Sequence, residues 1–165
     1  MNKRAGIRPK WLKVRVPGDL DRLPLSGLIN DLGLNTVCQE ARCPNIFECW
    51  AAGTATFMVL GEICTRRCTF CAVSRGVPMG ADPDEPRRVA EAVARMGVHH
   101  AVITMVNRDD MPDGGAEHIA RTVRAVRERS VAAVEVLISD LEGNHDALRI
   151  VMASRPEVLA HNIET

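Results

Sequence analysis

The stretch ATFMVLGEICTRRCTFC, residues 55–71, decides the fold that we expect for this chain. Its first part, residues 55–61, is an apolar run rich in strand formers that ends on a glycine, which is typical of a buried parallel strand. Three cysteines follow directly, in the spacing C-x3-C-x2-C. In folds built on parallel strands, reactive side chains gather at the carboxyl ends of the strands. The stretch therefore predicts an α/β protein with a site at that end of its sheet.

Strands and helices alternate along the rest of the chain. The expected strands cover 55–61, 99–106, 131–138 and 158–163, and the expected helices cover 86–96, about 119–129 and 144–155. A repeat of roughly 30 residues is the pattern of βαβ units on a parallel sheet. Four strands and three helices make about half of a closed (β/α) barrel. We therefore expect a partial barrel over 55–165 that looks truncated at its C-terminal end, preceded by a cysteine-bearing extension over 1–54.

The composition excludes several classes of function. The 165 residues carry 21 basic and 21 acidic side chains, so the formal net charge is zero. This argues against a protein that binds nucleic acid by neutralising its phosphates with a basic surface. No apolar run reaches the roughly 18–20 residues of a membrane-spanning helix, and the N-terminus lacks a signal peptide. Every lysine lies in the first 13 residues, which leaves none for a Schiff base or a Walker phosphate loop. We expect a cytoplasmic protein with no nucleic-acid or membrane partner.

Residues 1–30 are expected to form an arm. The segment is basic at first and is then interrupted by Pro17-Gly18, Pro24 and Gly27, which break any long periodicity. One interpretation is a solvated extension that packs loosely on the body of the protein. The other is a docking surface for an acidic partner.

All six cysteines lie between residues 38 and 71, in two triplets. Disulfides are disfavoured because the chain has no export signal. A zinc site would need a fourth ligand such as His99 or His100, and its spacing would be unusual. A thioredoxin-like pair of Cys68 and Cys71 is disfavoured by the third cysteine, Cys64. Three thiolates on one tight loop favour a four-iron cluster whose remaining iron stays open to a substrate or cofactor.

The downstream triplet, C-x3-C-x2-C, resembles that of radical S-adenosylmethionine enzymes. The upstream triplet, C-x4-C-x5-C, resembles the auxiliary-cluster motif that distinguishes the lipoyl synthase family within that group. The matching stretches are 36–50, 57–71, 106–115 and 161–165. The resemblance implies that one 4Fe-4S cluster binds S-adenosylmethionine and is held by Cys64, Cys68 and Cys71. It implies an auxiliary 4Fe-4S cluster, consumed as the sulfur donor and held by Cys38, Cys43 and Cys49. It further implies that the cofactor or the acyl-lysine faces a set of polar residues: Asn107, Arg108, Asp109, Asp110, Asn162 and Glu164.

The activity implied by the resemblance is that of a sulfurtransferase of lipoate biosynthesis. A 5′-deoxyadenosyl radical would permit insertion of two sulfur atoms, at C6 and C8 of an octanoyl chain. That chain would be carried on a lysine of a lipoyl domain or of the glycine-cleavage H protein, and ferredoxin or flavodoxin would supply electrons. Two alternatives are another radical S-adenosylmethionine enzyme that inserts sulfur and a non-catalytic iron–sulfur module.

The chain also departs from the family pattern. It has no tyrosine and no Arg-Ser-Ser-Tyr stretch, from which the family takes a serine as fourth ligand of the auxiliary cluster. Met105 stands where many members have a serine, and Ser139-Asp140-Leu141 replaces a more usual Pro-Asp-Phe.

Overall fold

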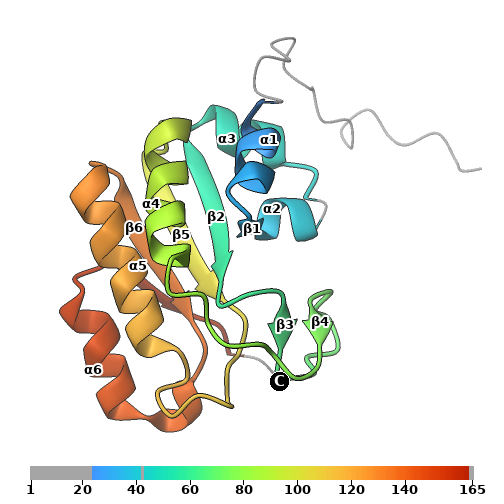
Figure 1. Cartoon of the computed structure of the whole chain (residues 1–165), viewed down its shortest axis with the longest axis vertical. Helices are drawn as coiled ribbons and strands as arrows, with labels where there is room; N and C mark the ends of the chain where they lie inside the picture. The colour runs from blue at the N-terminus through green and yellow to red at the C-terminus, as the bar shows by residue number, and fades with distance from the viewer. Residues whose placement is uncertain (1–23, 42, 164–165) are drawn as a thin grey trace, which may run out of the picture.

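The computed structural model describes residues 24–41 and 43–163 (Figure 1). In chain order, the elements are α1 (Pro24–Asp31), β1 (Asn35–Thr36), α2 (Val37–Glu40), α3 (Ile46–Ala51), β2 (Thr54–Val59), β3 (Ile63–Cys64), β4 (Ser74–Arg75), α4 (Glu85–Met96), β5 (His100–Met105), α5 (Ala116–Arg129), β6 (Ala133–Ile138), the 3-10 turn η3 (Leu141–Gly143), α6 (His145–Ala153) and β7 (Val158–His161).

The main sheet has the strand order β1-β2-β5-β6-β7. The last four strands run parallel to one another, which confirms the four parallel strands expected from the sequence. The first strand, β1, was not expected: it has two residues and pairs antiparallel with β2 through Asn35↔Met58 and Thr36↔Phe57. A strand of two residues is too short to show the alternation by which strands are recognised. The partial-barrel prediction holds, with extra elements at the N-terminal side.

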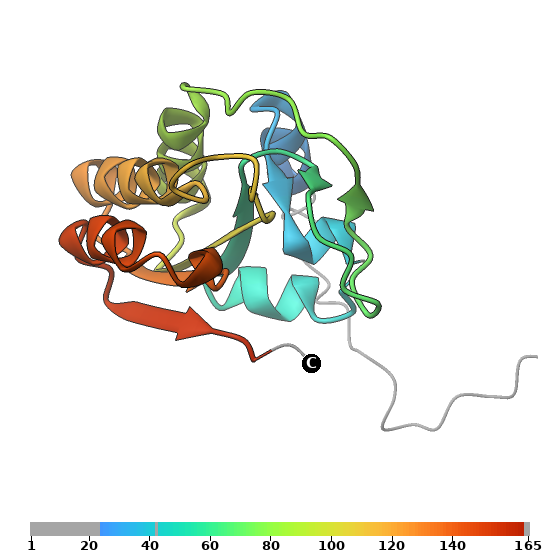
Figure 2. The same ribbon diagram turned by 90° about the horizontal axis from the view of Figure 1, so that it is seen from below.

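Helices α4, α5 and α6 cover one face of this sheet (Figures 1 and 2). Alternate residues of β5 and β6 are buried, among them Ile103 and Val136, which have no exposed surface. The residues between them, such as Thr104 and Leu137, are only half-buried and belong to the opposite face. Because α4, α5 and α6 cover only one face, these parallel strands alternate between two environments rather than being apolar throughout. The opposite face of β5 and β6 is thus left to form the site.

The helices begin and end for identifiable reasons. Pro86 lies in the first turn of α4, where a missing N–H costs nothing, and Gly97 ends the helix in the left-handed conformation at φ 63°. The Asn144 side chain caps α6 by accepting hydrogen bonds from two backbone N–H groups. Both signals are readable from the sequence. The expected helix over 86–96 is therefore observed within one residue.

The expectation that residues 24–30 belong to a loosely packed arm is wrong. They form most of α1, and Ile29 has no exposed surface because it packs in the same hydrophobic core as Leu34, Trp50 and Phe57. Burial of Leu28 and Ile29 outweighs the weak helix propensity of a segment containing Pro24 and Gly27. The remainder of the expected arm, residues 1–23, lies outside the described residues.

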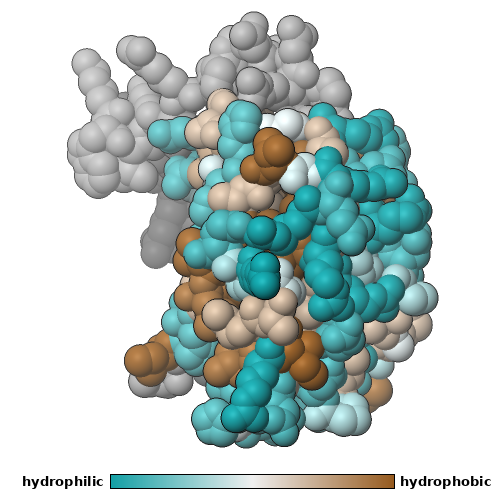
Figure 3. All heavy atoms as spheres, turned by 90° about the vertical axis from the view of Figure 1, so that its left-hand side faces the viewer, coloured by the Kyte–Doolittle hydropathy of each residue, from teal (hydrophilic) through white to brown (hydrophobic). Residues whose placement is uncertain are grey.

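The outer surface of the helices is mainly hydrophilic, as the face in Figure 3 shows. Its charged side chains form ion pairs such as Arg124–Glu117 along α5 and Arg87–Asp84 at the start of α4. Of the helices in 24–41 and 43–163, none combines the length and the apolar character needed to cross a bilayer.

Candidate functional site

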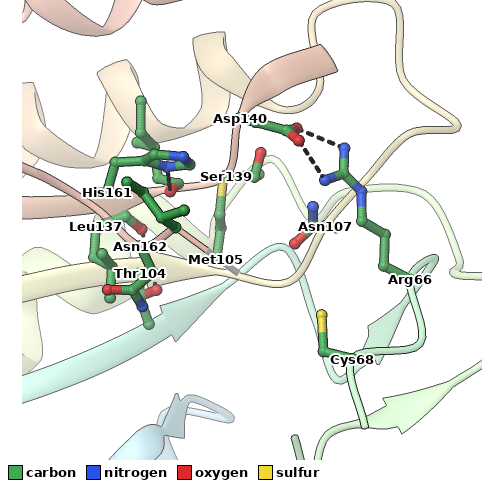
Figure 4. Close-up of a pocket in the computed structure, with 12 residues that line it drawn as sticks. Arg66, Cys68, Thr104, Met105, Asn107, Leu137, Ser139, Asp140, His161 and Asn162 are labelled. Carbon is green, nitrogen blue, oxygen red and sulfur yellow. Dashed lines mark hydrogen bonds and ion pairs between the residues drawn. The ribbon is translucent and has the colours of Figure 1, made fainter. Parts of the chain in front are cut away.

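A cavity of about 410 Å³ lies at the carboxyl ends of the parallel strands (Figure 4). Its walls come from the loop after β2, the ends of β5 and β6 with their following loops, and the residues from the end of β7 onward. The lining residues are Arg66, Cys68, Thr104, Met105, Asn107, Leu137, Ile138, Ser139, Asp140, His161, Asn162 and Ile163. The structure therefore brings the polar loops to one edge of the sheet, as the topology predicted.

One guanidinium ties three of these loops together. Arg66, in the cysteine loop, donates to both carboxylate oxygens of Asp109 at 2.8–3.1 Å. It also donates to both carboxylate oxygens of Asp140 at 2.7 and 2.9 Å (Figure 4). Asp109 follows β5 and Asp140 follows β6, so the loops after β2, β5 and β6 meet at Arg66. Sequence reasoning missed Arg66, because no spacing rule singles it out from its neighbour Arg67.

The same contacts set the protonation states at this edge. Hydrogen bonds from Arg66 hold the pKa of Asp109 below its ordinary value and lower that of Asp140 to about 2. The two carboxylates in turn raise the pKa of Arg66. All three groups are consequently charged at neutral pH, and together they carry one more negative than positive charge.

Thr65 fastens the cysteine loop to the loop after β5 at a second point. Its backbone N–H donates to the Asn107 carbonyl at 3.1 Å, and its hydroxyl donates to Asp109 at 2.7 Å. The Cys64–Cys68 segment is therefore held against the carboxyl end of β5.

The residues expected to face a ligand after β5 divide into two sets. Asn107 lines the cavity, and Asp109 binds Arg66 at the cavity edge. Arg108 and Asp110 bind each other instead, and the Arg108 side chain is only 3% exposed. Neither Arg108 nor Asp110 lines the cavity. Residues 109 and 110 lie in a turn after β5, so no simple alternation in the sequence separates the two sets.

The remaining expected residues lie at the far side of the cavity. Asn162 is part of the lining, next to His161, whose Nδ1 lies 3.0 Å from the Ile138 carbonyl oxygen (Figure 4). Glu164, which we also expected to line this edge, lies outside the described residues.

The downstream cysteines, Cys64, Cys68 and Cys71, occupy the loop between β2 and α4. The Cys64 sulfur accepts a hydrogen bond from the Arg66 backbone N–H at 3.4 Å, and the Cys71 N–H donates to the Cys68 carbonyl at 3.2 Å. Backbone N–H groups that point at sulfur stabilise thiolates and tune the potential of a bound iron–sulfur cluster. The donor set and this local geometry fit a cluster.

The upstream cysteines are Cys38 in α2, Cys43 in the connecting turn and Cys49 in α3. The Cys43 N–H donates to the Cys38 carbonyl at 3.0 Å. Burial raises the pKa of Cys49, and the neighbouring Cys38 and Cys43 thiolates raise it further. Three thiols that repel one another as thiolates form a donor set that bound iron would stabilise. The two cysteine segments lie on the same side of the molecule (Figures 1 and 2).

No disulfide links any of the six cysteines. Within 24–41 and 43–163, no three His, Cys, Asp or Glu side chains already converge closely enough to hold a single metal ion. In a four-iron cluster each thiolate binds a different iron, so its ligands are spaced more widely than those of one zinc ion.

Comparisons with known proteins place these observations in a family. A sequence profile of the radical SAM superfamily matches residues 58–165. The chain is 55% identical over 159 residues to a lipoyl synthase of Symbiobacterium thermophilum, a match that covers 96% of this chain and 50% of that protein. It is 54% identical over 160 residues to a lipoyl synthase of Thermus thermophilus, again covering 96% and 50%. A lipoyl synthase of Caldanaerobacter subterraneus is 51% identical over 159 residues, covering 96% and 55%. The chain spans about half the length of the curated relatives that it matches.

Proposed function

The chain belongs to the radical SAM superfamily, and on this premise we propose that it forms the N-terminal half of a lipoyl synthase. Membership implies a 4Fe-4S cluster and S-adenosylmethionine as cofactors. The observation that carries the more specific proposal is the presence of two separate cysteine triplets, Cys38, Cys43 and Cys49 in the first and Cys64, Cys68 and Cys71 in the second. A second triplet gives the chain a donor set for a second cluster.

We assign the two clusters to the two triplets. Cys64, Cys68 and Cys71 would hold the cluster that binds S-adenosylmethionine, and Cys38, Cys43 and Cys49 would hold an auxiliary cluster. When bound, the clusters would supply one-electron reduction of S-adenosylmethionine and the sulfur for insertion.

The cavity supplies the features that S-adenosylmethionine requires. A volume of about 410 Å³ lies within the usual range for small-molecule and cofactor sites. Asn107, Ser139 and Asn162 line it and offer amide and hydroxyl groups for the ribose and the amino-acid portion. Arg66, Asp109 and Asp140 leave one net negative charge at its edge, which favours a cationic sulfonium over a neutral or anionic ligand.

The substrate in this proposal is an octanoyl group on a lysine of a carrier protein, such as a lipoyl domain or glycine-cleavage H protein. The electron donor would be ferredoxin or flavodoxin. Unactivated C–H bonds require a radical, and the protein's own contribution is to hold the reacting carbon in place and to exclude competing reactions.

The test is anaerobic reconstitution of the full-length enzyme with iron and sulfide. The full-length parent should bind about eight irons, and Cys68→Ala and Cys43→Ala should each bind about four, because each variant loses one cluster. S-adenosylmethionine should change the electron paramagnetic resonance spectrum of the reduced Cys43→Ala variant and leave that of Cys68→Ala unchanged. Thr69→Ala, an exposed change in the same loop, is the matched control and should behave as the parent.

Three results would contradict the proposal: zinc in place of iron, a single cluster in the parent chain, or identical spectra for the two cysteine variants. In the complete enzyme, conversion of an octanoylated carrier separates a lipoyl synthase from another sulfur-inserting enzyme. Failure of any S-adenosylmethionine response would instead favour a non-catalytic iron–sulfur module.

A further inference from the structure

A single buried guanidinium joins the two ends of the cysteine loop. This loop, residues 60–80, leaves β2 at Leu60 and returns toward α4 after Met79. Arg108 donates from Nη1 to the Leu60 carbonyl at 3.3 Å and from Nη2 to the Met79 carbonyl at 2.9 Å. Two parallel hydrogen bonds of 2.9 Å to Asp110 fix the plane of the guanidinium. We call this arrangement the loop clasp.

A second buried group holds the start of the same loop. Leu60 has a φ of 71°, in the left-handed region that non-glycine residues rarely adopt. Its N–H donates to Glu85 Oε2 at 2.9 Å, and that oxygen lies 2.6 Å from His118 Nε2. Glu85 and His118 are each 5% exposed. Both backbone polar groups of Leu60 are thus bonded to buried side chains from other elements.

These contacts do not belong to the cavity at the carboxyl edge of the sheet, because Arg108, Glu85 and His118 are absent from its lining. Arg108 and Glu85 share contact with Leu60, where the chain turns from the sheet into the cysteine loop. Strained backbone persists only where its surroundings enforce it, and it concentrates at sites whose geometry matters. The contacts therefore bear on the path that the loop takes as it leaves the sheet.

We propose that Arg108, Glu85 and His118 are positioning residues that close the neck of the cysteine loop and so hold its three thiols at the carboxyl edge of the sheet. The part of this inference that concerns bound iron rests on the proposed function, whereas closure of the neck does not. Without the clasp, the loop would be held only farther along, by the pairing of β3 with β4 and by the contacts of Thr65 and Arg66 with Asp109, and its ligands would lose part of their preorganisation.

Hydrogen–deuterium exchange of the metal-free chain tests closure of the neck. Arg108→Gln should increase exchange at least tenfold in peptides from residues 60–80 and leave exchange in β6 unchanged. Arg121→Gln is the matched control: Arg121 also donates to a backbone carbonyl, that of Pro83 at 2.7 Å, but it lies on the exposed face of α5. The control should exchange as the parent does.

Two milder variants keep the test decisive if Arg108→Gln does not fold. Asp110→Asn loosens the guanidinium without removing it, and it should increase exchange in the same peptides by a smaller factor. Glu85→Gln keeps an acceptor for the Leu60 N–H, so its loop should exchange more slowly than that of Glu85→Ala. Unchanged exchange in residues 60–80, an equal effect of Arg121→Gln, or an increase that spreads equally to β6 would each overturn the proposal.

Iron content then separates the positioning role from the proposed function. On reconstitution, Asp110→Asn should lose iron from the Cys64 triplet and retain the cluster of the upstream triplet, whereas Arg121→Gln should retain both. Faster loop exchange together with full iron content would overturn the positioning role. If the parent chain itself bound no iron, the proposed function would fail while the exchange data still decided whether the neck is closed.

Discussion

Replacing Arg66 by Met should cost the metal-free chain about 1–2 kcal/mol of unfolding free energy. The variant keeps most of the aliphatic stem and removes the five hydrogen bonds that Arg66 makes to Asp109 and Asp140. Charged hydrogen bonds contribute about 1.5–3 kcal/mol when buried, whereas exposed ion pairs contribute about 0–1. The Arg66 and Asp109 side chains are 29% and 26% exposed and Asp140 is 53% exposed, so we expect about 1 kcal/mol from the first pair and about half of that from the second.

Urea unfolding followed by circular dichroism measures this loss. With a denaturant dependence of about 1.5–2 kcal/mol per molar, the midpoint should fall by roughly 0.5–1 M. A double-mutant cycle with Asp109→Asn should give a coupling energy of about 1 kcal/mol, and a cycle with Asp140→Asn should give less. Added salt should weaken the more exposed Asp140 coupling further than the Asp109 coupling.

The matched control is Arg149→Met, which removes an ion pair to Asp146 whose two side chains are 77% and 85% exposed. That change should leave the urea midpoint nearly unaltered. Strictly additive effects in both cycles would refute the reasoning, because Arg66 would then contribute nothing through the loops that it contacts.

Two further predictions concern the same edge of the sheet. Gly115→Ala should cost about 2–4 kcal/mol, because its new Cβ would lie 2.4 Å from Leu60 Cδ1 at a φ of +91°. Gly61→Ala, at φ +92° with nothing within 4 Å, should show only the backbone part of that loss, and equal losses would contradict the steric explanation. The Arg66 hydrogen bonds depress the pKa of folded Asp140 from 3.8 to about 2, so their stabilisation is present above pH 4 and is lost as the pH falls through about 2. Asp140→Asn should reduce this loss of unfolding free energy at low pH. An unchanged loss would show that Asp140 is not the group responsible for it.

The elements with a strong period were predictable from the sequence. The run over 55–61 is observed as β2 over Thr54–Val59, and the helix expected over 86–96 is observed as α4 over Glu85–Met96. The first segment is a continuous apolar run before Gly61 and the second carries apolar residues at the helical period before Gly97, so local signals and tertiary packing agree.

The N-terminal elements were not predictable for the opposite reason. Helix α1 contains Pro24 and Gly27, and among residues 27–31 its buried side chains are the adjacent Leu28 and Ile29. Two adjacent buried side chains do not show the period of a helix. The position of the helix depends on a core assembled from residues such as Trp50 and Phe57, far along the chain. A local sequence pattern cannot indicate a contact with residues that lie far away along the chain.

The site was predictable to the level of loops and no further. Parallel topology alone brings the loops after β2, β5 and β6 together, and the structure confirms that they line one cavity. The choice of partners was hidden: Arg66 meets Asp109 and Asp140 across 43 and 74 residues of sequence. Its neighbour Arg67 is exposed, although the two residues are identical in type.

The different positions of Arg66 and Arg108 explain how one loop can be both anchored and available for chemistry. Arg66 lies at the cavity and binds two carboxylates, so it leaves a negative edge there. Arg108 lies behind the loop, where Asp110 balances its charge and backbone carbonyls take its remaining donors. If Arg108 and Asp109 exchanged places, an arginine without a carboxylate partner would lie at the cavity edge near the cysteine loop. Its positive charge would oppose a cationic cofactor. The observed arrangement therefore favours a sulfonium ligand, because Asp109 binds Arg66 at the cavity edge while Arg108 is buried against Asp110 and outside the lining.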